Sequence, residues 1–299
     1  MECLKISGLK KSFGDKDVLK GIDMSVPEGS VFGFVGRNGA GKTTTMKAIL
    51  GLLRVDEGEI FVQGKRVRFG QTETNRFIGY LPDVPEFYSF MTAREYLNLC
   101  GQSLKMKDAD INKRSDELLA LVGLEGENHR IKGYSRGMKQ RLGIAQALLG
   151  SPKLLICDEP TSALDPIGRR EILDILSSVK GETTVLFSTH ILTDIERICT
   201  DVAFIKDGKI AKQGRVSDMK ALGRGEDILV EVSSESEINA LLLEFSNCRK
   251  SKELEVILSG EDGTMKRLLE FVSQNRIDIR RIQRVEPSLE NLFEEVFEV

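Results

Sequence analysis

Residues 36–43 read Gly-Arg-Asn-Gly-Ala-Gly-Lys-Thr, which fits the phosphate-loop pattern G-x-x-x-x-G-K-[ST] at every position. Glycines let successive backbone N–H groups turn toward an anion, and the N-terminus of a following helix adds partial positive charge. In such a loop Lys42 reaches the β- and γ-phosphates of a nucleotide, and Thr43 ligates Mg²⁺. We therefore predict that the nucleotide contacts are Gly36, Arg37, Asn38, Gly39, Ala40, Gly41, Lys42, Thr43 and Thr44.

The segments on either side of this loop have the required strand and helix character. Residues 31–35 are a short apolar run with strand propensity, and residues 44–50 have helix-forming composition and spacing. The alternative is an accidental glycine-rich turn, which would not require a strand before it and a helix after it. A strand, a loop and a helix in this order favour a phosphate site.

Two carboxylates follow another apolar run, residues 154–157. Ligands of parallel sheets bind beyond the carboxyl ends of the strands, so Asp158 should arrive near the phosphates and bind Mg²⁺ through its water shell. Glu159 is placed to orient and polarise the water that attacks the γ-phosphate. On its own, an Asp-Glu pair after a strand is more often a solvated turn; together with the phosphate loop it favours a catalytic site.

A histidine ends a third apolar run, residues 183–188. A lone histidine is usually a packed or solvated residue. Here the neutral imidazole of His190 could donate one hydrogen bond to the γ-phosphate and accept one from the attacking water. We predict that His190 acts together with Glu159 in catalysis.

The overall composition excludes several classes of protein. The chain has 299 residues and a formal net charge of −3, so it has no global attraction for nucleic acid, and we expect no nucleic acid partner. Apolar runs such as residues 154–157 and 240–243 are far shorter than the roughly 18–20 residues of a membrane span. The first residues carry charge and do not resemble a signal peptide. Five cysteines without a C-x-x-C motif are typical of reduced cytosolic thiols.

The order of apolar patterns predicts an α/β fold. Strand patterns at residues 4–9 and 18–26 and a hairpin at 58–65 indicate an antiparallel β subdomain around the phosphate-loop core. Residues 92–150 change to helical spacing and predict a helical insertion. Strand, helix and strand patterns then alternate from residue 153 to residue 188, as in a parallel sheet.

A second domain is predicted after the glycine turn at residues 223–225. Alternating apolar residues at 228–232 and 254–258 predict strands, and stripes at 268–272 and 289–297 predict helices. We expect domains at residues 1–222 and 223–299, the second a small α+β domain. The alternative is that these residues complete the main core.

Taken together, the motifs resemble those of the ATP-binding subunit of an ABC transporter, a P-loop NTPase with a RecA-like core, over about residues 1–220. Residues 134–141 are similar to the family signature Leu-Ser-Gly-Gly-Gln, residues 162–165 match the loop after the Asp158 strand, and His190 matches the switch histidine. The resemblance implies that two such subunits face head to tail around ATP. Ser135 and Gly137 would then contact the γ-phosphate held by the other subunit.

The resemblance also assigns roles to residues that spacing alone leaves open. It places Phe13 under the adenine ring, which suits an aromatic side chain at a turn, and it adds Asp165 to the nucleotide site. Three positions depart from the family pattern. Tyr134 replaces the signature leucine. Arg136 replaces the first signature glycine and brings positive charge near a phosphate. Asp83 stands where the family commonly has a glutamine, and it could bind the water shell of the metal.

The C-terminal residues 285–293 resemble a segment of ABC subunits of the drug, antibiotic, sodium and polysaccharide export type. They also fit a capped amphipathic helix with Ser288 near its start.

The resemblance implies an ATPase with the cofactors ATP and Mg²⁺, bound to the inner face of the cell membrane. Its expected partners are an integral membrane permease and a second ATP-binding subunit, either an identical copy or a close paralogue. One alternative is a soluble ABC ATPase that acts on ribosomes or DNA. Another, motivated by Asp83 and Arg136, is a nucleotide-gated regulator with little turnover.

Overall fold

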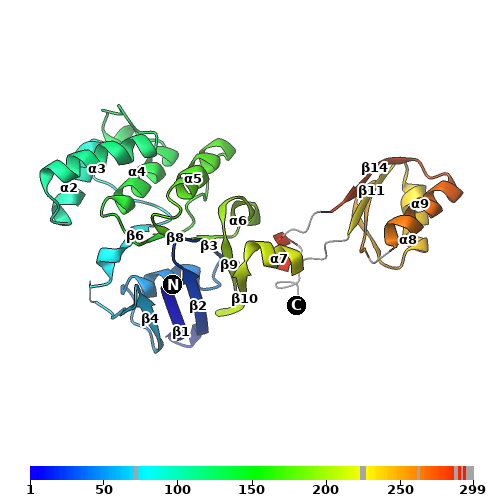
Figure 1. Ribbon diagram of the computed structural model, residues 1–299, viewed down its shortest axis with the longest axis horizontal. Helices are drawn as coiled ribbons and strands as arrows, with labels where there is room; N and C mark the ends of the chain where they lie inside the picture. Colours follow the sequence, from blue (N-terminus) through cyan, green and yellow to red (C-terminus); the bar gives the residue numbers. More distant parts are fainter. Residues whose placement is uncertain (71–72, 223–226, 261–262, 286–288, 291, 294–299) are drawn as a thin grey trace. The chain divides into compact units, whose positions relative to one another are not determined.

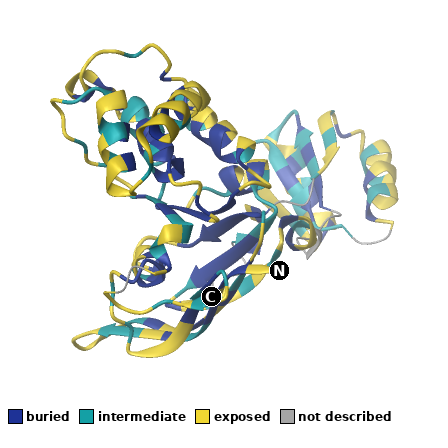
Figure 2. Ribbon diagram, turned by 60° about the vertical axis from the view of Figure 1, so that its left-hand side comes forward, coloured by how far each residue is buried: buried dark blue, intermediate teal, exposed yellow. Residues whose placement is uncertain are grey.

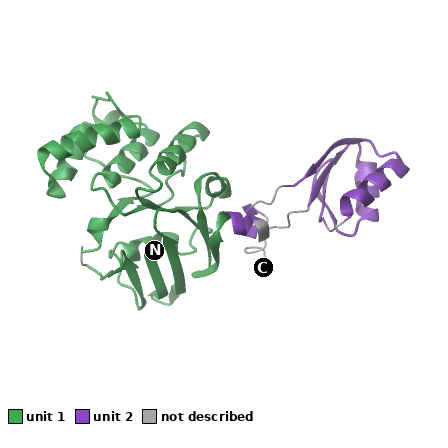
Figure 3. Ribbon diagram, viewed as in Figure 1, with its two compact units in different colours: residues 1–216 green, residues 217–299 purple. Residues whose placement is uncertain are grey.

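The computed structural model describes residues 1–70, 73–222, 227–260, 263–285, 289–290 and 292–293. Contacts group the chain into two compact units, Met1–Val216 and Ser217–Val299 (Figures 1 and 3). The larger unit ends at Val216, and the glycine turn at residues 223–225 lies outside the described residues. The domain boundary expected at residue 222 therefore stays a prediction. Within the described residues, no helix has the length and apolar character needed to cross a membrane.

The larger unit contains a six-stranded sheet with the order β10-β9-β3-β8-β7-β6. Neighbours from β9 to β6 are parallel, whereas β10 is antiparallel to β9. The central strands are buried at every position (Figure 2), as expected where both faces of a parallel sheet are covered. The strands are β3 (Val31–Val35), β6 (Ile78–Leu81), β7 (Leu154–Cys157), β8 (Thr184–Thr189), β9 (Asp201–Lys206) and β10 (Lys209–Arg215).

A second sheet of this unit is antiparallel, with the order β2-β1-β4-β5. Leu4, Ile22, Phe32 and Met46 belong to one apolar core, which joins this sheet to the phosphate-loop strand and helix. The expected antiparallel β subdomain is confirmed. Its strands are β1 (Glu2–Phe13), β2 (Lys16–Pro27), β4 (Glu57–Val62) and β5 (Lys65–Arg66).

The helices of the larger unit begin at residues that cap them well. Thr92 and Glu95 form a capping box, and Asp165 accepts a bond from the Gly168 N–H with Pro166 next in the chain. Three α-helices and one short 3₁₀ helix occupy the stretch expected to be a helical insertion. The helices are α1 (Lys42–Ile49), η1 (Asn75–Phe77), α2 (Ala93–Ser103), α3 (Asp108–Leu121), η2 (Ile131–Gly133), α4 (Arg136–Leu148), α5 (Pro166–Ser178) and α6 (Leu192–Ile198). Helix α7 (Val216–Leu222) begins at the last residue of the larger unit and continues into the smaller one.

The smaller unit has a four-stranded antiparallel sheet with the order β12-β13-β11-β14. Strands and helices alternate as βαββαβ, which is the ferredoxin-like arrangement. Ile228, Val230 and Val232 are buried in its core with residues of both helices, including Leu241 and Leu268. The elements are β11 (Ile228–Val232), α8 (Glu235–Glu244), β12 (Cys248–Lys252), β13 (Glu255–Leu258), α9 (Thr264–Asn275) and β14 (Ile279–Arg284).

The C-terminal segment is described only in part. Leu289 and Leu292 are helical and buried, in agreement with the predicted stripe. Residues 286–288, including the expected cap Ser288, and residues 291 and 294–299 lie outside the described residues.

Candidate functional site

Three neighbouring strands bring the predicted catalytic groups to one edge of the parallel sheet. β3 pairs with β8, and β8 pairs with β7, all in parallel. Val35 therefore lies beside Thr189, and Cys157 lies beside Phe187. The residues that follow these strands along the chain meet at the same edge because parallel strands end together.

The phosphate loop connects β3 to α1 and depends on its glycines. Gly39 and Gly41 have φ angles of 83° and 113°, which side-chain-bearing residues rarely adopt. At Gly41 an added Cβ would also lie 2.7 Å from Leu19 Cδ2, so this position excludes larger residues on two grounds. Lys42 is only 6% exposed, and its Nζ donates a hydrogen bond of 2.7 Å to the Gly36 carbonyl. This bond folds the lysine back over the loop.

Lys42, Glu159 and His190 form one cluster of charged and polar groups. The Lys42 Nζ lies 3.1 Å from Glu159 Oε1, and the His190 Nδ1 lies 3.0 Å from Glu159 Oε2. Glu159 is 14% exposed and sits in the left-handed backbone region at φ 48°. Such strained backbone persists only where the surroundings hold it, and it is common at functional sites. The carboxylate is thus held between the phosphate-loop lysine and the histidine.

Ser188 of β8 forms hydrogen bonds with both carboxylate residues, Asp158 and Glu159. Its hydroxyl donates a 2.7 Å hydrogen bond to Asp158 Oδ1 and accepts a 2.9 Å bond from the Glu159 N–H. Ser188 is fully buried, and Asp158 is nearly so. Ser188 was not predicted to be a site residue. A serine at the end of an otherwise apolar run, two residues before His190, is the signal that could have found it.

The residues at this edge fit a hard cation such as Mg²⁺. Asp158 and Thr43 offer carboxylate and hydroxyl oxygens, which are the ligands Mg²⁺ prefers. Glu159 Oε1 is buried and has no hydrogen-bond partner, because its contact with Lys42 has the distance of an ion pair but not the alignment of a hydrogen bond. That oxygen is available to a water molecule or ligand.

The signature residues begin α4 and are not part of the Lys42–Glu159–His190 cluster. Ser135 is the N-cap of α4, and its hydroxyl accepts a 3.2 Å bond from the Met138 N–H. Ser135 and Arg136 are exposed, and Gly137 is partly exposed. The first turn of α4 therefore presents a helix N-terminus at the surface, where anions are favoured.

Phe13 and Asp165 were assigned to the nucleotide site only by the family resemblance, and the structure shows what surrounds each of them. Phe13 ends β1 and is half exposed, and the Lys11 ammonium lies 5.3 Å from its ring centroid. An exposed aromatic face at this point is suited to stacking on a base. Asp165 is engaged as the N-cap of α5. The nucleotide contact expected of Asp165 stays a prediction.

Asp83 follows β6 and contacts two other segments. Its Oδ1 accepts a 2.5 Å bond from the Ser162 hydroxyl and lies 3.9 Å from Arg136 Nη2. The side-chain amide of the buried Gln140 donates hydrogen bonds of 3.3 Å to the backbone carbonyl of Asp83 and 3.2 Å to that of Pro160. Gln140 was not singled out from the sequence, where it is one polar residue among several in α4.

A buried carboxylate joins the loop after β7 to the helices α5 and α6. Asp194 accepts bonds of 2.8 Å from Thr161 and 2.6 Å from the Arg169 Nε, and Arg169 also donates to Thr193. Asp194 is almost completely buried. Sequence reasoning missed this network because its members are far apart in the chain and lie on three different elements.

Comparison with known proteins agrees with this arrangement. Residues 19–162 match the ABC transporter family. The chain is 44% identical over 218 residues to the ABC transporter ATP-binding protein YxlF of Bacillus subtilis, covering 73% of this chain and 72% of that protein. It is 35% identical over 298 residues to the bacitracin transport ATP-binding protein BcrA of Bacillus licheniformis, covering 97% and 95% of the two chains.

Solved structures show the same fold. The structure of cbiO1 from Clostridium perfringens, part of the ABC transporter complex cbiONQ, has a TM-score of 0.68 and 27% identity. It covers 81% of this chain and 95% of that one. An ATP-binding subunit of an ABC transporter superposes with a TM-score of 0.66 and 31% identity, covering 74% and 92% of the two chains. These matches confirm the P-loop NTPase fold. The chain belongs to the ABC transporter ATP-binding proteins, and it is an ATPase of that family.

Proposed function

We propose that this chain binds MgATP at residues 36–44, closes on a second ATP-binding subunit around the nucleotide, and drives transport through a separate membrane-spanning partner. The observation that carries the proposal is the meeting of Lys42, Glu159 and His190 at the phosphate loop. A lysine for phosphate, a carboxylate for water and a histidine beside it are the groups that phosphoryl transfer to water requires.

The ion pair between Lys42 and Glu159 suggests how nucleotide prepares the site. The buried ammonium of Lys42 is neutralised by Glu159. A γ-phosphate gives Lys42 a new partner, and Glu159 is then free to accept a proton from water while His190 keeps its orientation. Bound Mg²⁺ would be held by Thr43 and Asp158 and would neutralise charge on the β- and γ-phosphates.

The exposed N-terminus of α4 supports a composite site. Ser135, Arg136 and Gly137 offer a hydroxyl, a guanidinium and a backbone N–H at a helix start, which together suit a phosphate. They are not part of the chain's own Lys42–Glu159–His190 cluster. We therefore assign them to the ATP of a second subunit, an identical copy or a close paralogue.

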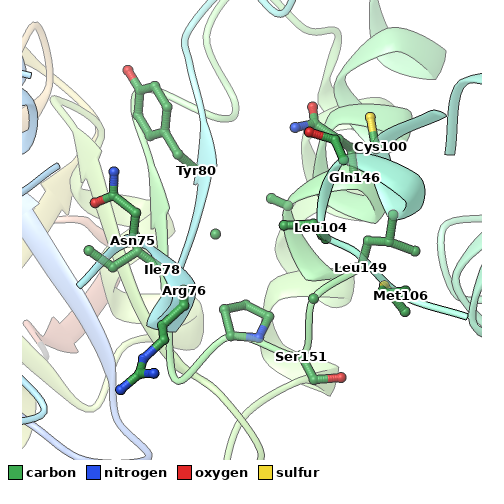
Figure 4. A pocket seen from close by; sticks show the side chains of 15 residues that line it. Asn75, Arg76, Ile78, Tyr80, Cys100, Leu104, Met106, Gln146, Leu149 and Ser151 are labelled. Atoms are coloured by element: carbon green, nitrogen blue, oxygen red, sulfur yellow. The ribbon is translucent and has the colours of Figure 1, made fainter. Parts of the chain in front are cut away.

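A groove beside β6 is our proposed docking site for the membrane partner. It has a volume of about 460 Å³, and Figure 4 shows Asn75 and Ile78 on one wall and Leu104, Gln146 and Leu149 on the other. The first wall belongs to η1 and β6, the strand that leads to Asp83, so an occupant would contact the segment that reaches the nucleotide site. We propose that a cytoplasmic segment of the permease fills this groove.

The lining of the groove suits a mixed polar and apolar segment. Burial, followed by the charge of Asp158, raises the pKa of Tyr80 to about 12, so the phenol is neutral at physiological pH. Leu104 is 53% exposed and lines the groove together with the polar side chains of Asn75 and Gln146.

The docking site can be tested with two exposed leucines. Leu104→Glu places a charge in the groove, whereas Leu243→Glu changes an exposed leucine of α8 in the smaller unit. We expect Leu104→Glu to reduce copurification with the membrane partner that the natural chain captures at least tenfold, and Leu243→Glu to leave it unchanged. Equal copurification of both variants would contradict the assignment of the groove.

The names of two relatives support the proposal that this chain powers transport. BcrA is named for bacitracin transport, and SrtF of Streptococcus pyogenes, 40% identical over 209 residues, is named for lantibiotic transport. We propose that this chain likewise serves antibiotic transport from the inner face of the cell membrane. Cosedimentation with ribosomes instead of a membrane protein would favour the soluble alternative.

ATP-dependent dimerisation tests the composite site. Glu159→Gln should retain ATP binding and form dimers with MgATP that light scattering detects, because hydrolysis no longer separates the subunits. Lys42→Ala should abolish this dimer by weakening ATP binding. A Glu159→Gln protein that binds MgATP with a second subunit present and remains monomeric would contradict the composite site.

A further inference from the structure

A pocket at the C-terminal end of α1 belongs neither to the nucleotide site nor to the groove beside β6. It has a volume of about 340 Å³ and lies between the end of α1, the loop that follows it, β4 and β5. Three arginines line it: Arg54 of the loop after α1, Arg66 of β5 and Arg68 of the loop after β5. The pocket shares no lining residue with the groove. The function proposed above therefore gives these arginines no role.

The floor of the pocket is part of the apolar core of the larger unit. Ile60 is buried, and Val55 and Val67 pack against the same core. The Val67 N–H donates a 2.8 Å hydrogen bond to the Ile60 carbonyl, and the Gly70 N–H donates a 3.0 Å bond to the Gly51 carbonyl. The core and these backbone bonds therefore hold the two loops that carry Arg54 and Arg68 side by side.

The acidic residues of this segment leave two of the arginines without a carboxylate partner. Each acidic residue from position 56 to position 59 pairs with another cation: Asp56 with Lys11, Glu57 with Lys10 and Glu59 with Arg66. Among the residues that the structure describes, neither Arg54 nor Arg68 belongs to an ion pair. Both arginines are exposed at the rim of the pocket, so they present positive charge to solvent.

Two large apolar side chains are exposed beside these arginines. Leu52 is 63% exposed and Phe69 is 60% exposed. Leu52 follows Gly51 and Phe69 precedes Gly70, so the backbone bond between these glycines brings the two apolar residues onto neighbouring loops. Apolar side chains grouped with basic ones suit the membrane interface, where the former reach the acyl chains and the latter meet anionic headgroups.

We propose that residues 52–54 and 66–69 form a surface that binds a membrane containing anionic phospholipids. Arg54 and Arg68 bind lipid phosphates, because a guanidinium matches a phosphate with parallel hydrogen bonds. The two exposed apolar side chains enter the region below the headgroups. A nucleic acid duplex also offers phosphates, but it offers no apolar layer, so the composition of this surface favours the lipid. The contact goes beyond the function proposed above, because it needs neither a second subunit nor the membrane partner.

Cosedimentation of the purified full chain with vesicles tests this surface. The vesicles consist of phosphatidylcholine alone or of phosphatidylcholine mixed with phosphatidylglycerol. We expect the natural chain to bind the mixed vesicles, and Arg54→Gln and Arg68→Gln each to lower the partition coefficient about fivefold. Phe69→Ser should lower it about tenfold through the loss of buried apolar area. Equal partitioning of the natural chain and the variants would overturn the proposal.

Matched controls separate this surface from the overall charge and apolarity of the chain. Lys105 and Lys113 are exposed residues outside the pocket, and the double variant Lys105→Gln, Lys113→Gln loses the same charge as the two arginine changes together. Ile167 is 70% exposed in α5, and Ile167→Ser matches Phe69→Ser. Both controls should bind the mixed vesicles within about twofold of the natural chain. Losses as large as those of the pocket variants would overturn the assignment to this surface.

Two further measurements distinguish the lipid from other sources of phosphate. We expect weaker binding to duplex DNA than to the mixed vesicles; equal or tighter binding that Arg54→Gln and Arg68→Gln abolish would assign the arginines to nucleic acid instead. Sodium chloride and sodium phosphate of the same ionic strength should release the chain from the vesicles equally, because both screen surface charge. Selective release by phosphate would assign the pocket to a free phosphate compound and overturn the lipid assignment.

Discussion

The two units of this chain each contain a partly buried glutamate paired with a lysine. In the larger unit Glu159 is 14% exposed and lies 3.1 Å from Lys42; in the smaller unit Glu255 is 15% exposed and lies 3.1 Å from Lys252. Each glutamate has one buried oxygen without a hydrogen-bond partner. The lysines differ, because Lys42 is 6% exposed and Lys252 is 75% exposed. Similar pair geometry therefore occurs in two very different surroundings.

The architecture of the sheets explains this difference. β7 and β8 are buried at every position, so their polar partners gather beyond the ends of the strands, where Glu159 lies. β11 and β13 alternate between buried and partly exposed positions, and Glu255 is one of the partly exposed residues within β13. A parallel sheet concentrates its polar groups at one edge, whereas this antiparallel sheet spreads them along its strands. Polar groups that gather at one edge of a sheet can bind a single ligand together.

The largest expected effect comes from removing the two glutamates in turn. Glu159→Gln should lower the steady-state ATPase rate by about 10²–10⁴-fold, the usual contribution of a positioned general base. Glu255→Gln should leave the rate within about twofold, because Glu255 belongs to the smaller unit and pairs with an exposed lysine, Lys252. A phosphate-release assay on both variants checks this, and near-normal turnover in Glu159→Gln would rule out the assigned role.

The buried Asp194 network should dominate the stability of the larger unit. Asp194→Ala leaves Arg169 without its buried partner, and we expect a loss of about 3–5 kcal/mol in the free energy of unfolding. Asp174, which pairs with Arg197 on the surface, is the control, and Asp174→Ala should cost about 0–1 kcal/mol. Urea denaturation measures both. Equal losses would show that burial does not distinguish the two carboxylates.

Core truncation in the smaller unit should affect that unit alone. Ile238 of α8 is fully buried in its core, so Ile238→Ala should destabilise it by about 2–5 kcal/mol. We expect hydrogen exchange to rise in β11 and β13 while the ATPase rate stays within about twofold. A parallel loss of ATPase activity would show that the smaller unit is needed for catalysis.

Removal of the Ser188 hydroxyl is expected to have the smallest effect of these substitutions on stability. Ser188→Ala removes a buried hydroxyl from Asp158 and from the Glu159 N–H, which should cost about 1–3 kcal/mol of stability and lower the ATPase rate. Ser233 of the smaller unit also donates to a carboxylate, that of Asp278, but its bond is exposed. Ser233→Ala should therefore cost about 0.5 kcal/mol or less. Equal costs would contradict the importance of burial at Ser188.

Several elements of the smaller unit were not predictable from residue patterns. β12 and β14 have no fully buried position and carry mostly charged or polar residues, because each is an edge strand of its sheet. Their sequences lack the apolar alternation that identified β11 and β13. Only pairing with those strands, seen in the structure, shows that they are strands and that the order is ferredoxin-like.

The sequence by itself determined which residues are candidates for chemistry at the phosphate loop. Gly36 to Thr43, Asp158, Glu159 and His190 were found by residue type, spacing and the apolar runs before them, because local chain geometry dictates both the loop and the strands. Ferredoxin-like order, the Asp194 network and the support of Asp158 by Ser188 were decided only by tertiary structure. The same is true of the contact between Asp83 and Arg136. These contacts join residues distant in the chain, and the burial that gives them their strength exists only after the elements have packed.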